Sequence, residues 1–144
     1  MKLFLVTKYI FVCTGNTCRS PLAESYMRSK FPDLDIQSRG LFVVEDTVNE
    51  NSLKIIDEEN LSKPSKPQNL SQEDIADSKL LVMGQNHKKA ILNFYPKANV
   101  SLLSDFVGQG NKDIMDPYGG EEKDYRKVFL EISSYIDQID DKIQ

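Results

Sequence analysis

Apolar and polar positions along the chain follow two periods, and the segments that carry each period alternate. Four short segments, the first of them a β-branched and aromatic run, predict strands at residues 9–13, 35–40, 78–83 and 100–105. Longer segments with apolar side chains at helical spacing predict helices over residues 20–31, 48–58 and 86–96, with a last helix after residue 120. A Ser-Gln-Glu-Asp run at residues 71–74 predicts a capped helical turn.

The predicted helices differ in how clearly they are marked. In the first, Ala23, Met27 and Phe31 form an inward-facing stripe, Pro21 suits the first turn and Ser20 suits the cap before it. The second has a weaker pattern. Its apolar positions are Val48, Leu53 and Ile56. The last helix keeps the period over a longer distance, through Val128, Ile132, Ile136, Ile139 and Ile143.

Strands that alternate with helices favour an α/β fold. We expect three layers, with a central parallel four-stranded sheet and helices on both faces. The 144 residues are close to the usual size of one domain, so we expect a single domain over 1–144, with 1–7 as a short N-terminal extension. Ligands of such folds bind beyond the carboxyl ends of the strands. Cys13 stands at that end of the first strand.

Composition narrows the class of protein and of partner. Hydrophobic residues make up 40% and charged residues 28% of the chain, which is typical of globular proteins. The net charge of -4 argues against nucleic acid or an anionic membrane as a partner. No apolar run reaches the roughly 20 residues of a membrane span, and Lys8 interrupts the apolar opening. We therefore expect a cytoplasmic protein without a signal peptide. The sequence does not determine the oligomeric state, and a monomer is the expectation.

Both cysteines of the chain, Cys13 and Cys18, lie in one short loop that Arg19 follows directly. Gly15 and Asn16 tolerate left-handed backbone, so the loop can turn successive backbone N–H groups towards an anion. The start of the next helix adds further donors, and Arg19 offers a planar fork that matches two phosphate oxygens. A thiolate at Cys13 would gain the same donors. The pattern indicates a nucleophile inside a phosphate cradle.

A loop with two cysteines can also serve functions other than phosphate binding. Two cysteines and the single histidine are too few for the four ligands of a structural zinc site. A cysteine–histidine hydrolase with His87 as base, a redox pair, and simple packing of the two thiols all stay open on the residues alone. A nucleotide-binding P-loop would need a Gly-Lys-Ser/Thr ending, which the loop lacks.

The string Cys-Thr-Gly-Asn-Thr-Cys-Arg-Ser-Pro at residues 13–21 resembles the phosphate-binding loop of the low-molecular-weight protein tyrosine phosphatases. Asp-Pro-Tyr-Gly-Gly at 116–120 is similar to the segment that carries the general acid of that family. Ser-Arg-Gly at 38–40 resembles the family's Ser-Ala-Gly, with Arg39 as a departure. Thioredoxin-coupled arsenate reductases share this fold and a similar loop, but they need more cysteines than this chain has and lack the Asp-Pro acid.

The resemblance implies a role for each matching residue. Cys13 would attack phosphorus, and Asp116 would protonate the leaving group and later activate water. Ser20 would hydrogen-bond the sulfur. The phosphate would be held by the loop, at Thr14, Gly15, Asn16, Thr17, Cys18 and Arg19. Tyr118 and Phe42 would form walls of the substrate cleft. No metal or cofactor is implied, and the partners would be phosphorylated proteins.

Thr17 stands where the tyrosine phosphatases commonly carry a bulky aliphatic residue such as Ile. The branch of the family with this string at every position resembles protein arginine phosphatases. We therefore expect a phosphoarginine phosphatase, with a phosphotyrosine phosphatase as the alternative and a non-catalytic phosphate-binding module as the alternative from another class. Because Cys18 lies in the same short loop as Cys13, it is also the candidate redox partner of Cys13.

Overall fold

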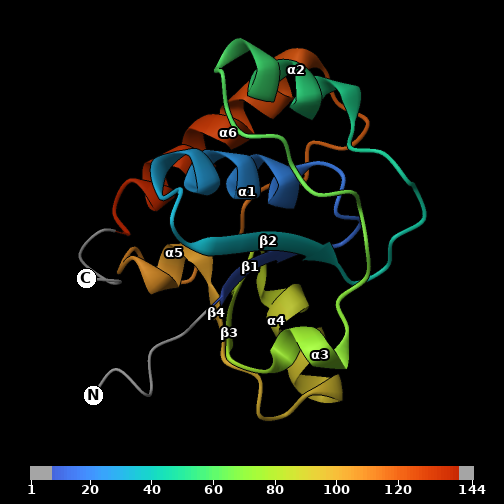
Figure 1. Ribbon diagram of the computed structural model, residues 1–144, viewed down its shortest axis with the longest axis vertical. Helices are drawn as coiled ribbons and strands as arrows, with labels where there is room; N and C mark the ends of the chain where they lie inside the picture. The colour runs from blue at the N-terminus through green and yellow to red at the C-terminus, as the bar shows by residue number, and fades with distance from the viewer. Residues whose placement is uncertain (1–7, 140–144) are drawn as a thin grey trace.

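The computed structural model describes residues 8–139, and a four-stranded parallel sheet lies at its centre (Figure 1). The strands are β1 (Lys8–Cys13), β2 (Asp35–Gly40), β3 (Ser78–Val82) and β4 (Val100–Leu102), in the spatial order β2-β1-β3-β4. Cys13 pairs with Gly40, and Val12 pairs with Val82. The fold class expected from the sequence is confirmed. The expected extension at residues 1–7 and Ile143 lie outside the described residues.

Helices cover both faces of the sheet and complete three layers (Figure 1). One face carries α1 (Arg19–Lys30), α2 (Glu50–Glu58), α5 (Leu103–Phe106) and α6 (Glu122–Ile136). The other face carries α3 (Gln72–Ile75) and α4 (Gln85–Phe94). The predicted Ser71–Asp74 capping box is present at the start of α3. None of the helices described between residues 8 and 139 is both long and apolar enough to cross a membrane.

Alternation along the strands supplies one core to each face. Phe11 and Leu81 point into the larger core, under α1 and α6, whereas Ile10, Val12 and Leu80 point into the smaller one, against α4. All five side chains are fully buried. Burying a large apolar side chain of this kind contributes about 1.5–3 kcal/mol, so the central strands are held firmly in register. The loop that follows β1 therefore starts from a rigid support.

Three local expectations were wrong. The segment 100–105 is a strand only as far as Leu102. Leu102 pairs with Val82, the last residue of β3, so no partner remains beyond it, and α5 begins at Leu103. Helix α1 begins at Arg19 with Cys18 as its cap, so Ser20 lies within the first turn and its hydroxyl serves another contact. In α2, Leu53 is 41% exposed and the buried apolar side chains are Ile55 and Ile56.

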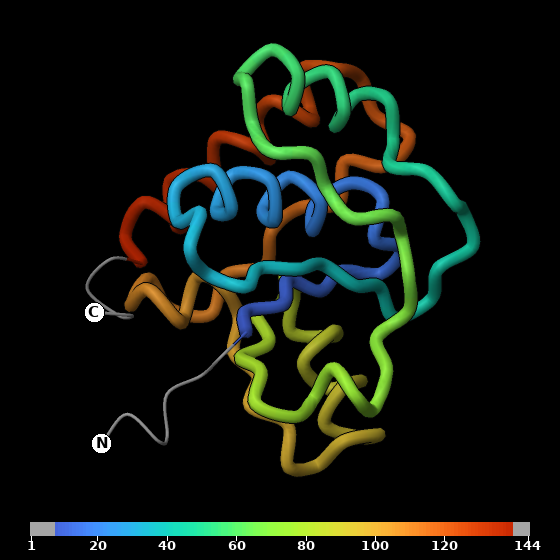
Figure 2. The backbone as a smooth tube through the Cα atoms, in the orientation of Figure 1, coloured from blue at the N-terminus to red at the C-terminus, as the bar shows by residue number. Residues whose placement is uncertain are grey.

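The carboxyl ends of β1 and β2 meet the loop before α6 at one edge of the molecule (Figure 2). From β1 the chain passes through α1 to β2 on one side, whereas β3 lies on the other side of β1. Loops therefore diverge at the end of β1, which is where open α/β sheets bind ligands. The long connection between α2 and α3 also reaches this edge, since Asn69 forms a parallel bridge with Gly40.

Candidate active site

The loop of residues 14–18 joins β1 to α1 and turns sharply at Asn16, whose φ is 57°. Left-handed backbone was also expected at Gly15, but Gly15 does not have a positive φ. The loop carbonyls are held from outside. Leu41 N–H donates to the carbonyls of Cys13 and Thr14, Asn49 N–H donates to that of Thr17 at 2.9 Å, and the Ser52 hydroxyl donates to that of Cys18.

The loop N–H groups have no such partners. Across residues 8–139, no acceptor is found for the backbone N–H groups of residues 14–18. A run of amide donors whose carbonyls are bound elsewhere forms a concave site for an anion, and the start of α1 adds its positive dipole end. The absence of acceptors is consistent with the cradle that the sequence predicts, and phosphate binding by these residues stays a prediction.

The Cys13 thiol and the Ser20 hydroxyl flank this loop and contact each other. Cys13 is 3% exposed, and its Sγ lies 2.9 Å from Ser20 Oγ. Ser20 reaches the sulfur because α1 begins one residue earlier, which brings its first turn back towards the end of β1. The expected contact between Ser20 and the sulfur is thus seen, although Ser20 is not the helix cap.

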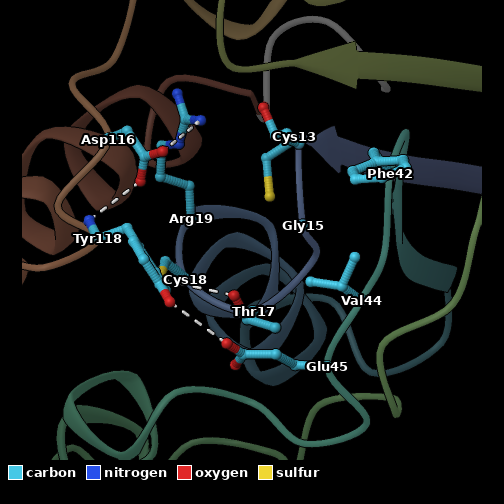
Figure 3. Close-up of a pocket in the computed structure, with 11 residues that line it drawn as sticks. Cys13, Gly15, Thr17, Cys18, Arg19, Phe42, Val44, Glu45, Asp116 and Tyr118 are labelled. Atoms are coloured by element: carbon cyan, nitrogen blue, oxygen red, sulfur yellow. Dashed lines mark hydrogen bonds and ion pairs between the residues drawn. The ribbon is translucent and has the colours of Figure 1, made fainter.

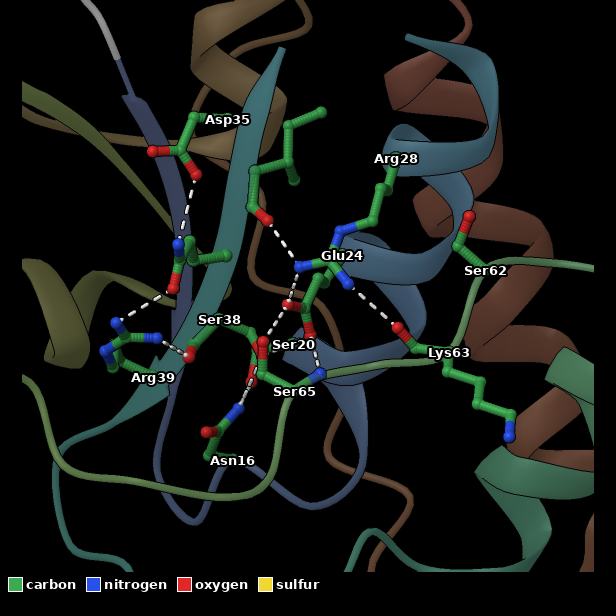
Figure 4. A network of polar contacts seen from close by, with 12 residues as sticks. Asn16, Ser20, Glu24, Arg28, Asp35, Ser38, Arg39, Ser62, Lys63 and Ser65 are labelled. Atoms are coloured by element: carbon green, nitrogen blue, oxygen red, sulfur yellow. Dashed lines mark hydrogen bonds and ion pairs between the residues drawn. The ribbon is translucent and has the colours of Figure 1, made fainter. Parts of the chain in front are cut away.

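A chain of buried polar contacts supports the loop from behind (Figure 4). The Asn16 amide donates to Ser20 Oγ at 2.8 Å and to Ser38 Oγ at 3.0 Å, and the Ser38 hydroxyl donates to Glu24 at 2.8 Å. The Glu24 carboxylate is fully buried and also accepts hydrogen bonds from Arg28 and from Ser65. A buried carboxylate needs several such donors, and here they connect α1, β2 and the α2–α3 connection to the loop.

Arg19 begins α1 and reaches towards the loop before α6. Its side chain is 8% exposed, Nη1 donates to the Ile114 carbonyl at 2.8 Å, and Nη2 lies 3.6 Å from Asp116 Oδ2. The buried Nε of Arg19 has no acceptor within the described part of the chain. One fork of the guanidinium is thus anchored, while Nε remains available to an oxyanion.

A cleft of about 280 Å³ lies in front of the loop (Figure 3). Phe42 and Tyr118 stand on its two sides and are 71% and 63% exposed. Thr17, 7% exposed, lines the same cleft, and its hydroxyl lies 3.7 Å from Cys18 Sγ. Cys13, Arg19, Asp116, Thr17, Phe42 and Tyr118, which the sequence pointed to from distant segments, are therefore brought together in one site.

Asp116 stands at the mouth of this cleft, where its side chain is half exposed. The Tyr118 N–H donates to Asp116 Oδ1 at 3.1 Å, so the turn after Pro117 holds the carboxylate in place. An Asp that bonds the backbone two residues ahead is typical of such turns. Its second oxygen still faces Arg19, so the same residue both shapes the turn and reaches the site.

Two further groups border the loop. His87 is buried and its Nε2 lies 2.9 Å from Thr14 Oγ1; burial, with the nearby charge of Arg19, lowers the pKa of His87 to about 4. His87 thus contacts the threonine and not the Cys13 sulfur, which argues against a cysteine–histidine pair. Cys18 Sγ lies 3.5 Å from the Tyr125 hydroxyl, and burial raises the pKa of the Cys18 thiol.

Sequence reasoning missed Val44 and Glu45 in the cleft, and Glu24 and Ser38 behind the loop. Val44 and Glu45 come after the carboxyl end of β2, which is the neighbour of β1 in the sheet. Residues at that position commonly line the ligand site of such folds, so their position could have identified them. Glu24 carries no local signal, whereas Ser38 belongs to the Ser-Arg-Gly run at 38–40, although the sequence assigned no role to this residue. Over residues 8–139, no three or more His, Cys, Asp or Glu side chains are grouped so as to hold a metal ion.

Comparison with known proteins agrees with this geometry. The model of the family "low molecular weight phosphotyrosine protein phosphatase" matches residues 8–144. The chain is 41% identical over 134 residues to a low molecular weight protein-tyrosine-phosphatase, PtpB, of Staphylococcus epidermidis, which covers 92% of this chain and 96% of that protein. The chain belongs to this family of cysteine-based phosphatases, and it is a phosphoprotein phosphatase.

Solved structures point to two activities within the family. The YwlE arginine phosphatase of Geobacillus stearothermophilus has a TM-score of 0.89 and 32% identity, covering 95% of this chain and 92% of that one. A low molecular weight protein tyrosine phosphatase of T. tengcongensis has a TM-score of 0.87 and 30% identity, covering 94% and 98%. The fold is thus shared by two solved proteins whose names state different substrates.

Proposed function

We propose that this protein hydrolyses phosphoarginine in proteins through a covalent phosphocysteine. The observation that carries the proposal is Thr17, a polar side chain in the wall of the cleft directly beside the phosphate cradle. The hydroxyl's partner within the loop is a sulfur 3.7 Å away, which is a weak contact and leaves its hydrogen-bonding capacity largely unused. The likeness to a solved arginine phosphatase supports the same choice.

In the first step, the Cys13 thiolate attacks phosphorus in line with the scissile bond. An S–P bond forms as the P–N bond breaks, and the carboxylic acid of Asp116 gives its proton to the leaving guanidine nitrogen. The N–H groups of residues 14–18 and Arg19 hold the equatorial oxygens, where charge is spread in the transition state. The contact of 2.9 Å between Ser20 Oγ and Cys13 Sγ stabilises the sulfur as an anion.

In the second step, the Asp116 carboxylate accepts a proton from water, and the water oxygen attacks phosphorus. The S–P bond breaks, inorganic phosphate leaves, and the Cys13 thiolate is restored with Asp116 protonated again. Asp116 can serve both steps because the turn to Tyr118 fixes one oxygen while the other stays at the cleft. No metal or cofactor enters either step.

The leaving group decides between the two candidate substrates. A guanidinium brings several N–H donors into the cleft, and the Thr17 hydroxyl can accept one of them directly or through water. Asp116 suits that substrate twice, because its carboxylic acid delivers the proton to the leaving nitrogen and the carboxylate that remains can pair with the departing guanidinium. Phe42 and Tyr118 can pack on the flat guanidinium as well as on an aryl ring.

Phosphotyrosine is the second candidate, since the curated relatives are named tyrosine phosphatases and aromatic walls suit an aryl ring. A non-catalytic phosphate-binding module is less consistent with the site, because phosphate binding alone requires neither Cys13 nor Asp116. Loss of turnover in Cys13→Ser, with the fold and phosphate binding kept, would separate an enzyme from a binding module.

The deciding experiment compares kcat/KM on matched phosphoarginine and phosphotyrosine peptides for the parent and for Thr17→Ile. An unpaired donor of the guanidinium in the cleft costs about 1–3 kcal/mol, so we expect the phosphoarginine preference to fall about tenfold to a hundredfold. A parent enzyme that turns over only phosphotyrosine would contradict the proposed substrate. An unchanged ratio in Thr17→Ile would show that Thr17 is not the selecting residue.

A further inference from the structure

We propose that Glu45 is a specificity-determining residue that binds the cationic leaving group of the substrate. The proposal rests on the proposed function, and it concerns the far wall of the same cleft. Glu45 follows β2, lines the cleft together with Val44, and is drawn beside Thr17 in Figure 3. Glu45 lies outside the loop of residues 14–18, so we assign its carboxylate to the leaving group and not to the phosphate.

The position of Glu45 is held by a contact across the cleft. The Tyr118 hydroxyl donates to Glu45 Oε1 at 3.4 Å, which joins the loop after β2 to the loop before α6 (Figure 3). Tyr118 is in turn attached to Asp116 through its backbone N–H. A substrate side chain that reaches Cys13 must therefore pass beside a wall in which an aromatic ring and a carboxylate are already linked.

The charges in the cleft make this carboxylate selective. Its charged lining residues are Arg19, Asp116 and Glu45. Arg19 pairs with Asp116, whereas Glu45 has no cationic partner among residues 8–139 and accepts only the long bond from Tyr118. A guanidinium entering the cleft would supply that partner, with planar N–H groups that match a carboxylate.

An aryl leaving group would meet the same carboxylate without any donor to offer. Its entry would remove water from Glu45 and return nothing, which disfavours phosphotyrosine relative to phosphoarginine. Thr17 and Glu45 both line the cleft, so the two can accept different N–H groups of one guanidinium. Selectivity is then shared between a neutral acceptor close to phosphorus and a charged one farther out.

The test measures kcat/KM of the parent, Glu45→Gln and Glu73→Gln on N-phosphoarginine and O-phosphotyrosine, each as a blocked single residue without neighbouring side chains. Gln keeps the size of Glu45 and an acceptor for Tyr118 but removes the charge. Glu73 is an exposed residue of α3, away from the cleft, and its variant matches the change in net charge. We expect the kcat/KM of Glu45→Gln to fall about five- to tenfold on phosphoarginine and to fall little on phosphotyrosine. Glu73→Gln should match the parent on both substrates.

The loss in Glu45→Gln should also shrink at high ionic strength, which a purely structural effect would not do. Equal losses on both substrates, or no loss on either, would overturn the role of Glu45 while leaving phosphoarginine as the substrate. The same variants are also compared on peptides with basic neighbours. A loss that appears there and not on the blocked single residues would overturn the role of Glu45 too, because Glu45 would then bind flanking residues. A parent inactive on phosphoarginine would overturn the proposed function and this inference together.

Discussion

At the scale of single residues, Asp116 has to meet two demands at once. One oxygen accepts the Tyr118 N–H at 3.1 Å, and the other lies 3.6 Å from Arg19 Nη2. In the proposed reaction the same carboxyl delivers a proton and then removes one, so its position matters as much as its acidity. Asn in this place keeps the turn and loses the proton.

We expect Asp116→Asn to reduce turnover of substrates with poor leaving groups by about a hundredfold or more. An activated aryl phosphate needs little protonation of its leaving group, so its rate of phosphocysteine formation should fall far less. Burst kinetics on both substrates would separate this step from hydrolysis of the intermediate. Similar losses in the first step for both substrates would argue against Asp116 as proton donor.

Cys18 gives the second prediction at this scale. It is 4% exposed, burial raises the pKa of its thiol, and it lies in the same loop as Cys13. We expect dilute peroxide to oxidise the Cys13 thiolate to a sulfenic acid, which the Cys18 sulfur then attacks, forming a disulfide and releasing water. Thiol reductants should restore activity.

Peptide mapping after mild oxidation should find the Cys13–Cys18 pair, and Cys18→Ser should become irreversibly inactive at the same peroxide dose. Recovery of Cys18 as a free thiol beside an over-oxidised Cys13 would rule out this protective role. The contacts of Cys18 Sγ with Thr17 and Tyr125 show that it also packs beneath the loop, so the serine variant needs its own stability measurement.

At the scale of elements, the end of β2 fits closely against the phosphate-binding loop. A Cβ placed on Gly40 would lie 2.6 Å from Val43 Cγ2, 2.9 Å from the Thr14 carbonyl oxygen and 3.0 Å from Asn16 Cβ. Gly40 also binds the α2–α3 connection, since its N–H donates to Gln68 and its carbonyl accepts from Leu70. Gly40 therefore contacts both the phosphate-binding loop and the α2–α3 connection, and a side chain there would clash with its neighbours.

We expect Gly40→Ala to destabilise the fold by about 1–3 kcal/mol, because the Thr14 carbonyl oxygen and the side chains of Val43 and Asn16 leave the methyl group little room. It should also lower kcat, since the Thr14 carbonyl belongs to the loop that forms the cradle. Gly110→Ala offers a control of the opposite kind, with open space for the methyl group but strain from a φ of 81°. Chemical denaturation and activity measured together would show whether only Gly40→Ala affects the site.

Some parts of the fold and of the site could be predicted from the sequence, and others could not. The Cys13–Arg19 loop could be predicted because its chemistry is local, in one strand–loop–helix segment. The residue at which β4 ends could not be predicted, because β4 ends where its partner strand β3 ends. Glu24 and His87 depend on neighbours 41 and 73 positions away, Ser65 and Thr14, and no local pattern marks such contacts.

At the scale of the whole molecule, stability should depend on pH through His87. Burial lowers its pKa to about 4, below the value near 6.5 of an exposed histidine. The unfolded chain then binds more protons between these values, so this stabilising contribution is complete above about pH 6.5 and is lost as the pH falls towards 4. The shift corresponds to at most about 3 kcal/mol.

Replacing His87 by Gln keeps a polar partner for Thr14 and removes the titration. We expect the free energy of unfolding of His87→Gln to fall less steeply than that of the parent between about pH 6.5 and 4.5. Urea denaturation across this range measures the difference, while the carboxylates contribute similarly to both proteins. Parallel curves would show that His87 does not carry this pH dependence.

The buried Nε of Arg19 has a consequence for the energetics of the entire chain. A buried donor without an acceptor destabilises the folded state by about 1–3 kcal/mol, and Arg19 Nε is such a donor beside the phosphate-binding loop. Any tetrahedral oxyanion that accepts from Nε relieves it only in the folded state, so the anion and folding are thermodynamically linked. Phosphate at a hundred times its dissociation constant would stabilise the folded state by about 2.7 kcal/mol. The reaction product is thereby a folding ligand: melting in phosphate should exceed melting in chloride of equal ionic strength, and Arg19→Lys should lose most of that gain.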